Sequence, residues 1–270
     1  MLTKYPVSVF IITKNEEERL AYAINSVIDW VDEVIIIDSG SDDNTIAIAK
    51  NLGAATYFNK WPGYGEQKIF GASKCKNDWL LNIDADEAIS EKLRDEICNL
   101  FDKNIIDQYH MYKLDIRIMS RFSNYPKKFA PANEPVRLYN KNYANFKDST
   151  VHDSVVAKAG IHAKTAKLDN IVLHRCFKSY KHAVEKINFY SSMQALDMQQ
   201  RGRVPSKIRI VIEPFFAFFK AFFLRRYFIL GIDGFIESVL YSFARAIRLG
   251  KVIELEKERK FNEKTHNENK

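Results

Sequence analysis

Residues 78–87 read DWLLNIDADE, a short apolar run that ends in a group of acidic side chains. The run from Trp79 to Ile83 has the near-continuous apolar character of a strand buried on both faces of a sheet. Asp84 and Asp86 follow it, separated by one residue, so both carboxylates can reach one hard cation such as Mg²⁺ or Mn²⁺. A solvated acidic turn or a helix cap would place carboxylates in the same way, and this pattern alone favours neither interpretation.

Two earlier strands are followed by polar clusters in the same manner. The apolar run at residues 7–12 leads into Thr13-Lys14-Asn15-Glu16, and the run at residues 34–37 leads into Asp38-Ser39-Gly40. Helical patterns alternate with the strands, at residues 16–31, 44–52 and 67–75. This alternation predicts βαβ units and a mainly parallel sheet. Because ligands of open α/β sheets bind beyond the carboxyl ends of the strands, all three clusters are expected at one rim.

The composition of the chain fits a globular protein kept in a reducing compartment. Its 270 residues are 46% hydrophobic, enough for one sizeable domain with an appendage. The three cysteines, Cys75, Cys98 and Cys176, lack a CxxC or Cys/His metal spacing. The N-terminus lacks the features of a signal peptide, and charges interrupt the longest apolar stretch, residues 208–224. We therefore expect a cytoplasmic chain without a membrane-spanning helix.

The net charge of +7 belongs entirely to the C-terminal region. Residues 201–270 hold 15 of the 41 Lys and Arg but only 8 of the 34 Asp and Glu, so residues 1–200 are neutral overall. Seven phenylalanines lie between Phe215 and Phe228, among Lys220, Arg225 and Arg226. This combination indicates an anionic membrane surface rather than nucleic acid as the partner. A helical hairpin that packs its phenylalanines on protein is the alternative.

The clusters at the other two strand ends carry groups that suit a nucleotide. Asp38 can accept hydrogen bonds from a base or ribose, and Gly40 permits close approach of the backbone to a ligand. Lys14 can meet a phosphate and Thr13 a base or ribose group. Gln67 and Lys68 would contribute only if the loop at residues 61–65 folds over the nucleotide. Helix capping at residues 41–43 and a solvated Lys14 are the structural alternatives.

Taken in order, these segments resemble glycosyltransferase family 2, which has the GT-A fold. The subgroup that is most similar is the bacterial lipopolysaccharide-core glucosyltransferases, and the resemblance covers roughly residues 5–200. The runs that carry it are ITKNEEERL, DSGSDDNT, WPGYGEQK, DWLLNIDADE and PVRLYNKNYANFKDSTVHDSV. The resemblance implies inverting, metal-dependent transfer from a UDP-sugar, with UDP-glucose as the expected donor and a membrane glycolipid as the expected acceptor.

The resemblance also implies roles for individual residues. It places Asp38 near the uracil, Lys68 near the diphosphate, and Asp84 and Asp86 at the ribose and the Mg²⁺ or Mn²⁺ ion. The predicted metal ligands are Asp86 and Asp84. The full set of predicted nucleotide-binding residues is Thr13, Lys14, Glu16, Asp38, Gln67, Lys68 and Asp84.

Inverting transfer needs a base that takes the proton from the acceptor hydroxyl. Asp153 is the first candidate, because the similar subgroup has an acidic residue after a histidine at this point, and Asp148 is the reserve. A salt-bridged loop pair of His152 and Asp153 is the alternative. The run Gln200–Val204 has the QxxR spacing of processive synthases but ends in Val204 where they have tryptophan, so we expect addition of a single sugar.

These inferences predict an α/β protein of the GT-A type with a helical C-terminal extension. We expect a catalytic domain at residues 1–205, with a nucleotide-binding half to about residue 100 and an acceptor-facing half after it. Residues 206–252 are expected to be a basic, membrane-associating helical extension on the inner face of the cytoplasmic membrane, and residues 253–270 a disordered tail. Two other functions are considered: a sugar-nucleotide nucleotidyltransferase, which would need a glycine-rich loop after the first strand, and a non-catalytic membrane-surface protein on the same fold. The oligomeric state cannot be inferred.

Overall fold

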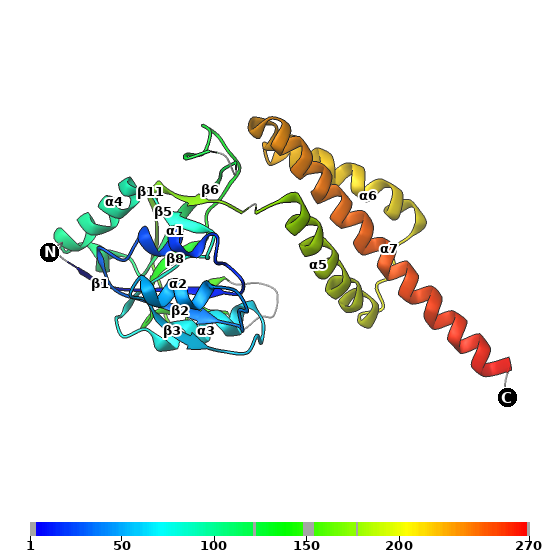
Figure 1. The fold of residues 1–270 in the computed structure, drawn as a ribbon, viewed down its shortest axis with the longest axis horizontal. Helices are drawn as coiled ribbons and strands as arrows, with labels where there is room; N and C mark the ends of the chain where they lie inside the picture. The colour runs from blue at the N-terminus through cyan, green and yellow to red at the C-terminus, as the bar shows by residue number, and fades with distance from the viewer. Residues whose placement is uncertain (1–3, 121–122, 148–153, 177, 269–270) are drawn as a thin grey trace. The chain divides into compact units, whose positions relative to one another are not determined.

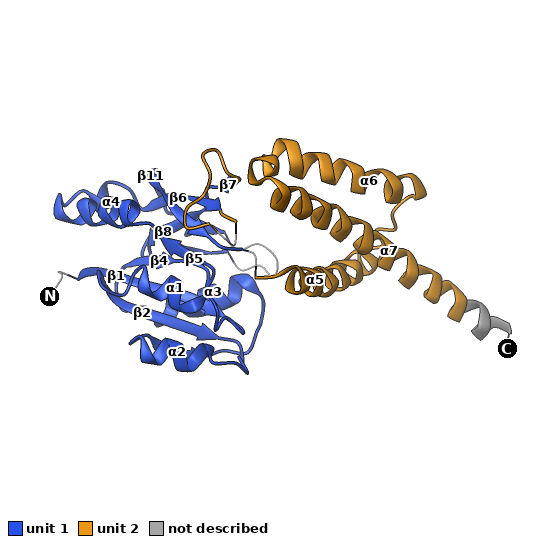
Figure 2. Ribbon diagram, turned by 45° about the horizontal axis from the view of Figure 1, so that its top comes forward, with its two compact units in different colours: residues 1–118, 132–176 blue, residues 119–131, 177–270 orange. Residues whose placement is uncertain are grey.

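Figure 1 shows the computed structural model, which describes residues 4–120, 123–147, 154–176 and 178–268, with side chains as far as Asn262. The chain divides into two compact units (Figure 2). Unit 1 consists of Met1–Ile118 and Ala132–Cys176, and unit 2 of Met119–Pro131 and Phe177–Lys270.

Unit 1 is built on a mixed sheet. In the described part of the chain this sheet has nine strands in the order β3-β2-β1-β4-β8-β6-β11-β5, with β7 paired to β6, and a separate two-stranded ribbon joins β9 to β10. The strands are β1 (Tyr5–Thr13), β2 (Val31–Asp38), β3 (Ala55–Phe58), β4 (Trp79–Asn82), β5 (Glu87–Ile89), β6 (Met111–Ile118), β7 (Ala132–Asn133), β8 (Val136–Asn140), β9 (Ala144–Phe146), β10 (Val155–Ala157) and β11 (Thr165–His174).

The first four strands confirm the predicted parallel arrangement. β1 pairs in parallel with both β2 and β4, and β2 pairs in parallel with β3. Thr13 at the end of β1 lies opposite Asp38 at the end of β2, so the two polar clusters meet. β8 runs antiparallel between β4 and β6, while β11 runs parallel to β6. The carboxyl ends of β6 and β11 therefore lie at the same rim as those of β1, β2 and β4.

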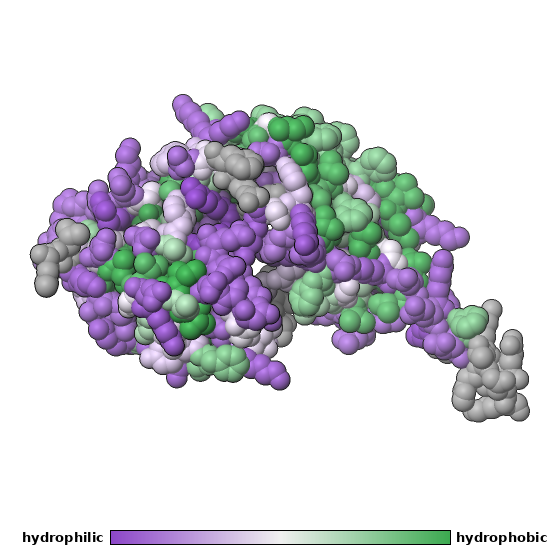
Figure 3. Space-filling view, in the orientation of Figure 1, coloured by the Kyte–Doolittle hydropathy of each residue, from purple (hydrophilic) through white to green (hydrophobic). Residues whose placement is uncertain are grey.

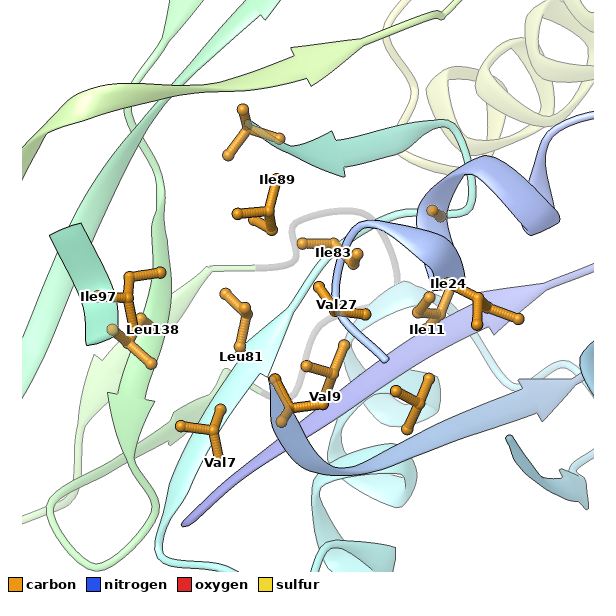
Figure 4. Close-up of a cluster of buried hydrophobic side chains, with 14 of the residues drawn as sticks. Val7, Val9, Ile11, Ile24, Val27, Leu81, Ile83, Ile89, Ile97 and Leu138 are labelled. Atoms are coloured by element: carbon orange, nitrogen blue, oxygen red, sulfur yellow. The ribbon is translucent and has the colours of Figure 1, made fainter. Parts of the chain in front are cut away.

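One face of the sheet is covered by α1 (Leu20–Asn25) and α4 (Glu91–Asp102). Their side chains pack on β1 and β4 in the larger of the two buried clusters (Figure 4), and the residues in contact include Val9, Ile11, Ile24, Leu81, Ile83 and Ile97. α4 begins at Ser90, whose hydroxyl accepts the backbone N–H of Leu93. The predicted helix at residues 16–31 is in fact confined to α1, because turns at residues 17–19 and 26–30 flank it and β2 begins at Val31. Glu16 and Glu17, at the first turn, form hydrogen bonds with residues 43–45 of the β2–α2 connection.

α2 (Thr45–Asn51) packs on the same face as α1 and α4 through Ala49, and the opposite face is covered by α3 (Tyr64–Lys74). α3 packs with Phe10, Ile37 and Leu80 in a second buried cluster. Gly71 is required for this approach, because a Cβ atom there would lie 2.6 Å from Phe10 Cδ2 and 3.2 Å from Ile37 Cγ1. The close packing of α3 against β1 positions Lys68, on the same helix, at the rim.

Unit 2 is helical. α5 (Tyr180–Gln200) and α6 (Lys207–Phe219) each pack along α7 (Ile232–Glu268), and two short turns, η2 (Lys220–Leu224) and η3 (Tyr227–Leu230), connect α6 to α7. Ser179 and Ser206 begin α5 and α6 by accepting the backbone N–H three residues later. A further short turn, η1 (Ile106–Gln108), precedes β6 in unit 1. The described residues contain no helix with both the length and the apolar content needed to cross a bilayer.

The division of the chain differs from the predicted domain boundary at residue 205. α5, which the sequence places in the catalytic domain, is grouped with α6 and α7 in unit 2. α7 also continues to Glu268, through the segment expected to be a disordered tail. Pairs such as Glu256 with Arg259 and Lys260, spaced for one helical face, favour this continuation.

Candidate active site

Asp38 organises the loop after β2. Its carboxylate accepts the backbone N–H groups of Gly40 and Ser41, each at 2.8 Å, and the hydroxyl of Thr13 at 3.2 Å. Gly40 has a φ of 98°, a conformation that glycine adopts without strain. Asp38 is 4% exposed, so this carboxylate is a fixed, buried acceptor at the carboxyl ends of β1 and β2.

Asp84 is held between two cations. Its carboxylate lies 3.0 Å from Lys68 Nζ and 2.6 Å from Arg137 Nη2. Burial acts to raise the pKa of Asp84, but the charges of Arg137 and Lys68 outweigh it and hold the pKa well below its usual value. Asp84 therefore anchors a lysine and an arginine whose side chains are buried, at 0% and 8% exposure.

Arg137 binds more than Asp84. Its guanidinium also donates to Asn82 Oδ1 at 2.7 Å and to Glu87 Oε1 at 3.0 Å. Glu87 is 2% exposed, and its second oxygen accepts the backbone N–H of Asp84 at 2.9 Å. Burial raises the pKa of Glu87, against the lowering effect of Arg137. This network fixes the DADE segment after β4.

Asp86 faces a different set of partners. Arg19 Nη1 lies 3.1 Å and His174 Nε2 lies 3.5 Å from Asp86 Oδ2. Burial acts to lower the pKa of His174, but the hydrogen bond to Asp86 and its charge raise the pKa above the usual value. Burial likewise acts to raise the pKa of Asp86, and His174 and Arg19 keep it low. A carboxylate and an imidazole, from the β4–β5 segment and the end of β11, therefore meet at one point.

This pair fits a divalent metal ion in its donor chemistry. Carboxylate oxygen suits Mg²⁺ and Mn²⁺, and imidazole nitrogen is a common ligand of the transition metals. Asp86 and His174 are 16% and 24% exposed in their side chains, so neither is sealed off from a ligand. Among the described residues no group of three or more potential His, Cys, Asp or Glu ligands gathers. A metal held here would need oxygen atoms from a bound ligand to complete its coordination.

Of the other predicted residues, Gln67 and Glu16 make polar contacts at the rim, whereas Lys14 is exposed. Gln67 is buried and donates to Ser39 Oγ at 3.1 Å, which links α3 to the loop after β2. Glu16 binds Arg19 at 2.7 Å and so connects the loop after β1 to Asp86. Lys14 is exposed at the end of β1. Polar contacts therefore join the three strand-end clusters, as their position in the sequence predicts.

The two predicted base residues, Asp148 and Asp153, lie outside the described residues. They belong to the connection between β9, which ends at Phe146, and β10, which begins at Val155. The β9 end of this connection is close to the rim, because Lys68 Nζ lies 5.3 Å from the centroid of the Phe146 ring.

Sequence reasoning missed four residues that structure the site: Arg19, Glu87, Arg137 and His174. Two of the four, Arg137 and His174, could have been recognised from the sequence. An arginine within the run Val136-Arg137-Leu138-Tyr139 is a charge inside a buried strand, which needs a partner. His174 ends the apolar run Ile171-Val172-Leu173, just as Asp38 and Asp84 follow theirs.

Comparison with known proteins assigns the family. A family model described as glycosyl transferase family 2 matches residues 8–167, more than half of the chain. The chain belongs to glycosyltransferase family 2. This family 2 glycosyltransferase has the GT-A fold, as the sequence predicted.

Individual proteins are similar to this chain over most of its length. An uncharacterized glycosyltransferase of Rickettsia bellii is 47% identical over 94% of this chain and 88% of its own length. The lipopolysaccharide core biosynthesis glycosyltransferase LpsC of Rhizobium meliloti is 28% identical over 92% of this chain and 93% of its own length. Among solved structures, a glucosyl-3-phosphoglycerate synthase of Mycobacterium tuberculosis in complex with Mn²⁺ and UDP is similar with a TM-score of 0.44 at 16% identity, over 74% of this chain and 81% of that one.

Proposed function

We propose that the protein transfers a single sugar, with glucose as the proposed sugar, from a UDP-sugar to a membrane glycolipid, with inversion at the anomeric carbon. The proposed setting is lipopolysaccharide core synthesis, or synthesis of another envelope glycan, at the inner face of the cytoplasmic membrane. The observation that carries the proposal is the meeting of Asp86 with His174 beside the Lys68–Asp84–Arg137 cluster. Similarity to LpsC supports the class of acceptor.

In this proposal the nucleotide lies across the ends of β1, β2 and β4. Asp38 and Thr13 supply acceptor and donor groups toward the uracil, whose ring N–H needs an acceptor. Lys14, Glu16 and Gln67 lie along the same rim and are assigned to the nucleotide with them. Lys68 faces the diphosphate, where a compact cation offsets phosphate charge.

A Mg²⁺ or Mn²⁺ ion would be held by Asp86 and His174 and would offset the charge that develops on the departing nucleoside diphosphate. Asp84, engaged by two cations, is assigned to keep Lys68 and Arg137 directed at the same phosphates and to approach the ribose or the metal. Arg19 neutralises Asp86 and would move toward a phosphate once the metal binds there.

The base is assigned to the connection between β9 and β10. Asp153 would accept the proton of the acceptor hydroxyl, with Asp148 in reserve. Inverting transfer needs a base that is not a metal ligand, and neither residue is among the proposed ligands. The variant Asp153→Asn is expected to bind UDP as the natural chain does and to lose transfer. If Asp153→Asn transferred sugar fully and Asp148→Asn did not, the base would be assigned to Asp148 instead.

A transfer assay tests the proposal. The protein is incubated with radiolabelled UDP-glucose, UDP-galactose or UDP-N-acetylglucosamine, Mn²⁺ and bacterial envelope glycolipid, and label is counted in the lipid fraction. We expect label from one donor, loss of transfer in Asp86→Asn and normal transfer in Asp42→Asn, an exposed carboxylate on the loop after β2. Equal transfer by Asp86→Asn and the natural chain would contradict the proposed site.

A further inference from the structure

Helix α6 exposes its apolar side chains to solvent. An ordinary surface helix buries its apolar stripe and exposes its polar face. α6 and the turn η2 nevertheless expose eight large apolar side chains, beside the exposed cations Lys207, Arg209 and Lys220. The eight are Ile208, Val211, Ile212, Phe215, Phe216, Phe219, Phe223 and Leu224, which are 43–78% exposed. Their helical spacing places those of α6 along one stripe, and Figure 3 shows hydrophobic surface over α6 and the adjoining part of α7.

The side of α6 that packs within unit 2 combines a small residue, polar contacts and the Phe218 ring. Ala217 is buried at 7% exposure. Glu213 binds Arg209 on its own helix and Arg248 of α7, each at 2.6 Å. The hydroxyl of Ser242 donates to the carbonyl oxygen of Pro214 at 2.7 Å. These contacts to α7 fix the orientation of α6, and its apolar stripe lies on the side that they leave uncovered.

α7 extends the same apolar surface. Ile232, Phe235, Val239 and Phe243 recur at helical spacing and are 43–71% exposed. The Phe235 ring also packs against Phe218 of α6, with ring centroids 5.6 Å apart. Contiguous apolar surface of this kind marks an interaction site on a protein.

Cations gather where α6 ends, since Lys220 begins η2 and Arg225 follows it. The guanidinium carbons of Arg225 and Arg245 lie 4.8 Å and 5.1 Å from the Tyr241 ring centroid, and Arg245 donates to the Tyr241 hydroxyl at 2.9 Å. Burial acts to raise the pKa of Tyr241, but Arg245, Arg225 and Lys220 lower it, as converging positive charge does. Among the described residues, no carboxylate forms an ion pair with Lys220, Arg225 or Arg245.

The nearby acidic groups are used inside unit 2. Residues 207–251 hold eight Lys and Arg against three Asp and Glu. Glu213 faces Arg248, and Asp233 accepts hydrogen bonds from Ser120 at 2.8 Å and Tyr180 at 3.4 Å. The third acidic residue, Glu237, lies near Tyr180 and adds to burial in raising the pKa of that tyrosine. Positive charge at Lys220 and Arg225 thus adjoins the exposed apolar residues Phe219, Phe223 and Leu224 of α6 and η2.

We infer that the α6–α7 hairpin docks on an anionic phospholipid bilayer, with the apolar stripe of α6 at the level of the acyl chains and a lipid phosphate bound by Lys220, Arg225 and Arg245 beside Tyr241. Phosphates complement this charge, whereas a two-fold pairing of the same face with a second copy would gather like charges from both chains. The inference deepens the proposed function by naming the surface that presents the acceptor.

Vesicle flotation of the full chain, without sugar nucleotide, tests the inference. Binding is expected to vesicles that contain phosphatidylglycerol and to be much weaker with pure phosphatidylcholine. Lys220→Gln with Arg225→Gln is expected to weaken binding by about 25-fold, roughly fivefold for each cation. Lys50→Gln with Lys103→Gln, which removes two exposed cations of unit 1, is the matched control and is expected to leave binding unchanged.

The apolar contribution is tested in the same assay. Phe216→Ser with Leu224→Ser is expected to weaken binding by at least about tenfold, because both side chains would leave the acyl region. Phe58→Ser, at a 69% exposed phenylalanine of unit 1, is the control. Equal binding to neutral and anionic vesicles, or equal losses in the controls, would overturn the inference. The inference would also be overturned if the chain did not bind vesicles but formed a dimer, measured by light scattering, and if Phe216→Ser dissociated that dimer.

Because the readout is lipid binding alone, its failure leaves the transferase proposal intact. Conversely, a chain that binds anionic vesicles but transfers no sugar would retain the docking surface and refute the proposed reaction.

Discussion

Replacing Arg137 with methionine removes one cation from three acceptors at once. The guanidinium binds Asn82, Asp84 and Glu87 at 2.6–3.0 Å, and the Arg137 side chain is 8% exposed. Asp84 keeps Lys68, but the 2% exposed Glu87 loses its cation. Breaking a buried pair from one side costs about 3–5 kcal/mol, because an uncompensated charge stays buried. We expect the free energy of unfolding to fall by that amount.

Urea unfolding followed by tryptophan fluorescence measures this change in unit 1 specifically. Trp30, Trp61 and Trp79 are the three tryptophans of the chain, and all belong to unit 1. Trp30 and Trp79 are 4% and 5% exposed, so unfolding transfers both to water. Arg94→Met is the matched control, because the Arg94–Asp95 pair is exposed and worth at most about 1 kcal/mol.

A double variant and a pH series test whether the buried charge of Glu87 causes the loss of stability. Glu87→Gln combined with Arg137→Met removes both charges and should restore about 1–3 kcal/mol. The pKa of Glu87 is raised from 4.5 in the folded state, so the folded chain binds this proton more readily than the unfolded one. In Arg137→Met the loss of stability should therefore be smallest below pH 4.5, and it should grow as the pH rises through the pKa of Glu87 in the folded state. A loss no larger than that of Arg94→Met at neutral pH would refute the reasoning.

Three further changes have defined outcomes. His174→Gln should weaken Mn²⁺ binding by about tenfold or more, measured by paramagnetic resonance of the free ion; unchanged affinity would remove His174 from the metal site. Asp38→Ala should lower the free energy of unfolding by about 1.5–3 kcal/mol, since it leaves two backbone N–H groups without their acceptor; unchanged urea unfolding would contradict that role. Gly71→Ala should cost about 1–3 kcal/mol by forcing α3 away from Phe10. The open site at Gly250 should accept alanine without loss, and equal effects in the two glycine variants would refute the close approach of α3.

Much of the rim could be predicted because it follows local rules. A buried strand that ends in polar residues places them at the carboxyl edge, and parallel pairing then brings Thr13 and Asp38 together. Gln67 and Lys68 were correctly expected on a helix, and the contact of Lys68 with Asp84 joins the helix to the strand end.

The rest depended on pairing between distant segments. β8 lies antiparallel between β4 and β6, which brings Arg137 to Asp84 although the two are 53 residues apart in sequence. The pattern of apolar residues does not predict this strand order. His174 reaches Asp86 because β11 pairs with β5. The apolar spacing of α6 can be recognised in the sequence. Which side of α6 is exposed cannot, because it depends on contacts between two helices, such as the Glu213–Arg248 pair.

Calorimetric titration of the purified protein with UDP, in Mn²⁺ and then in EDTA, tests the central claim most directly. We expect UDP to bind only when the metal is present, Asp86→Asn to remove this binding, and Asp42→Asn to retain it. Binding that is equal in EDTA, or unaffected by Asp86→Asn, would contradict a metal-dependent nucleotide site at the carboxyl ends of these strands.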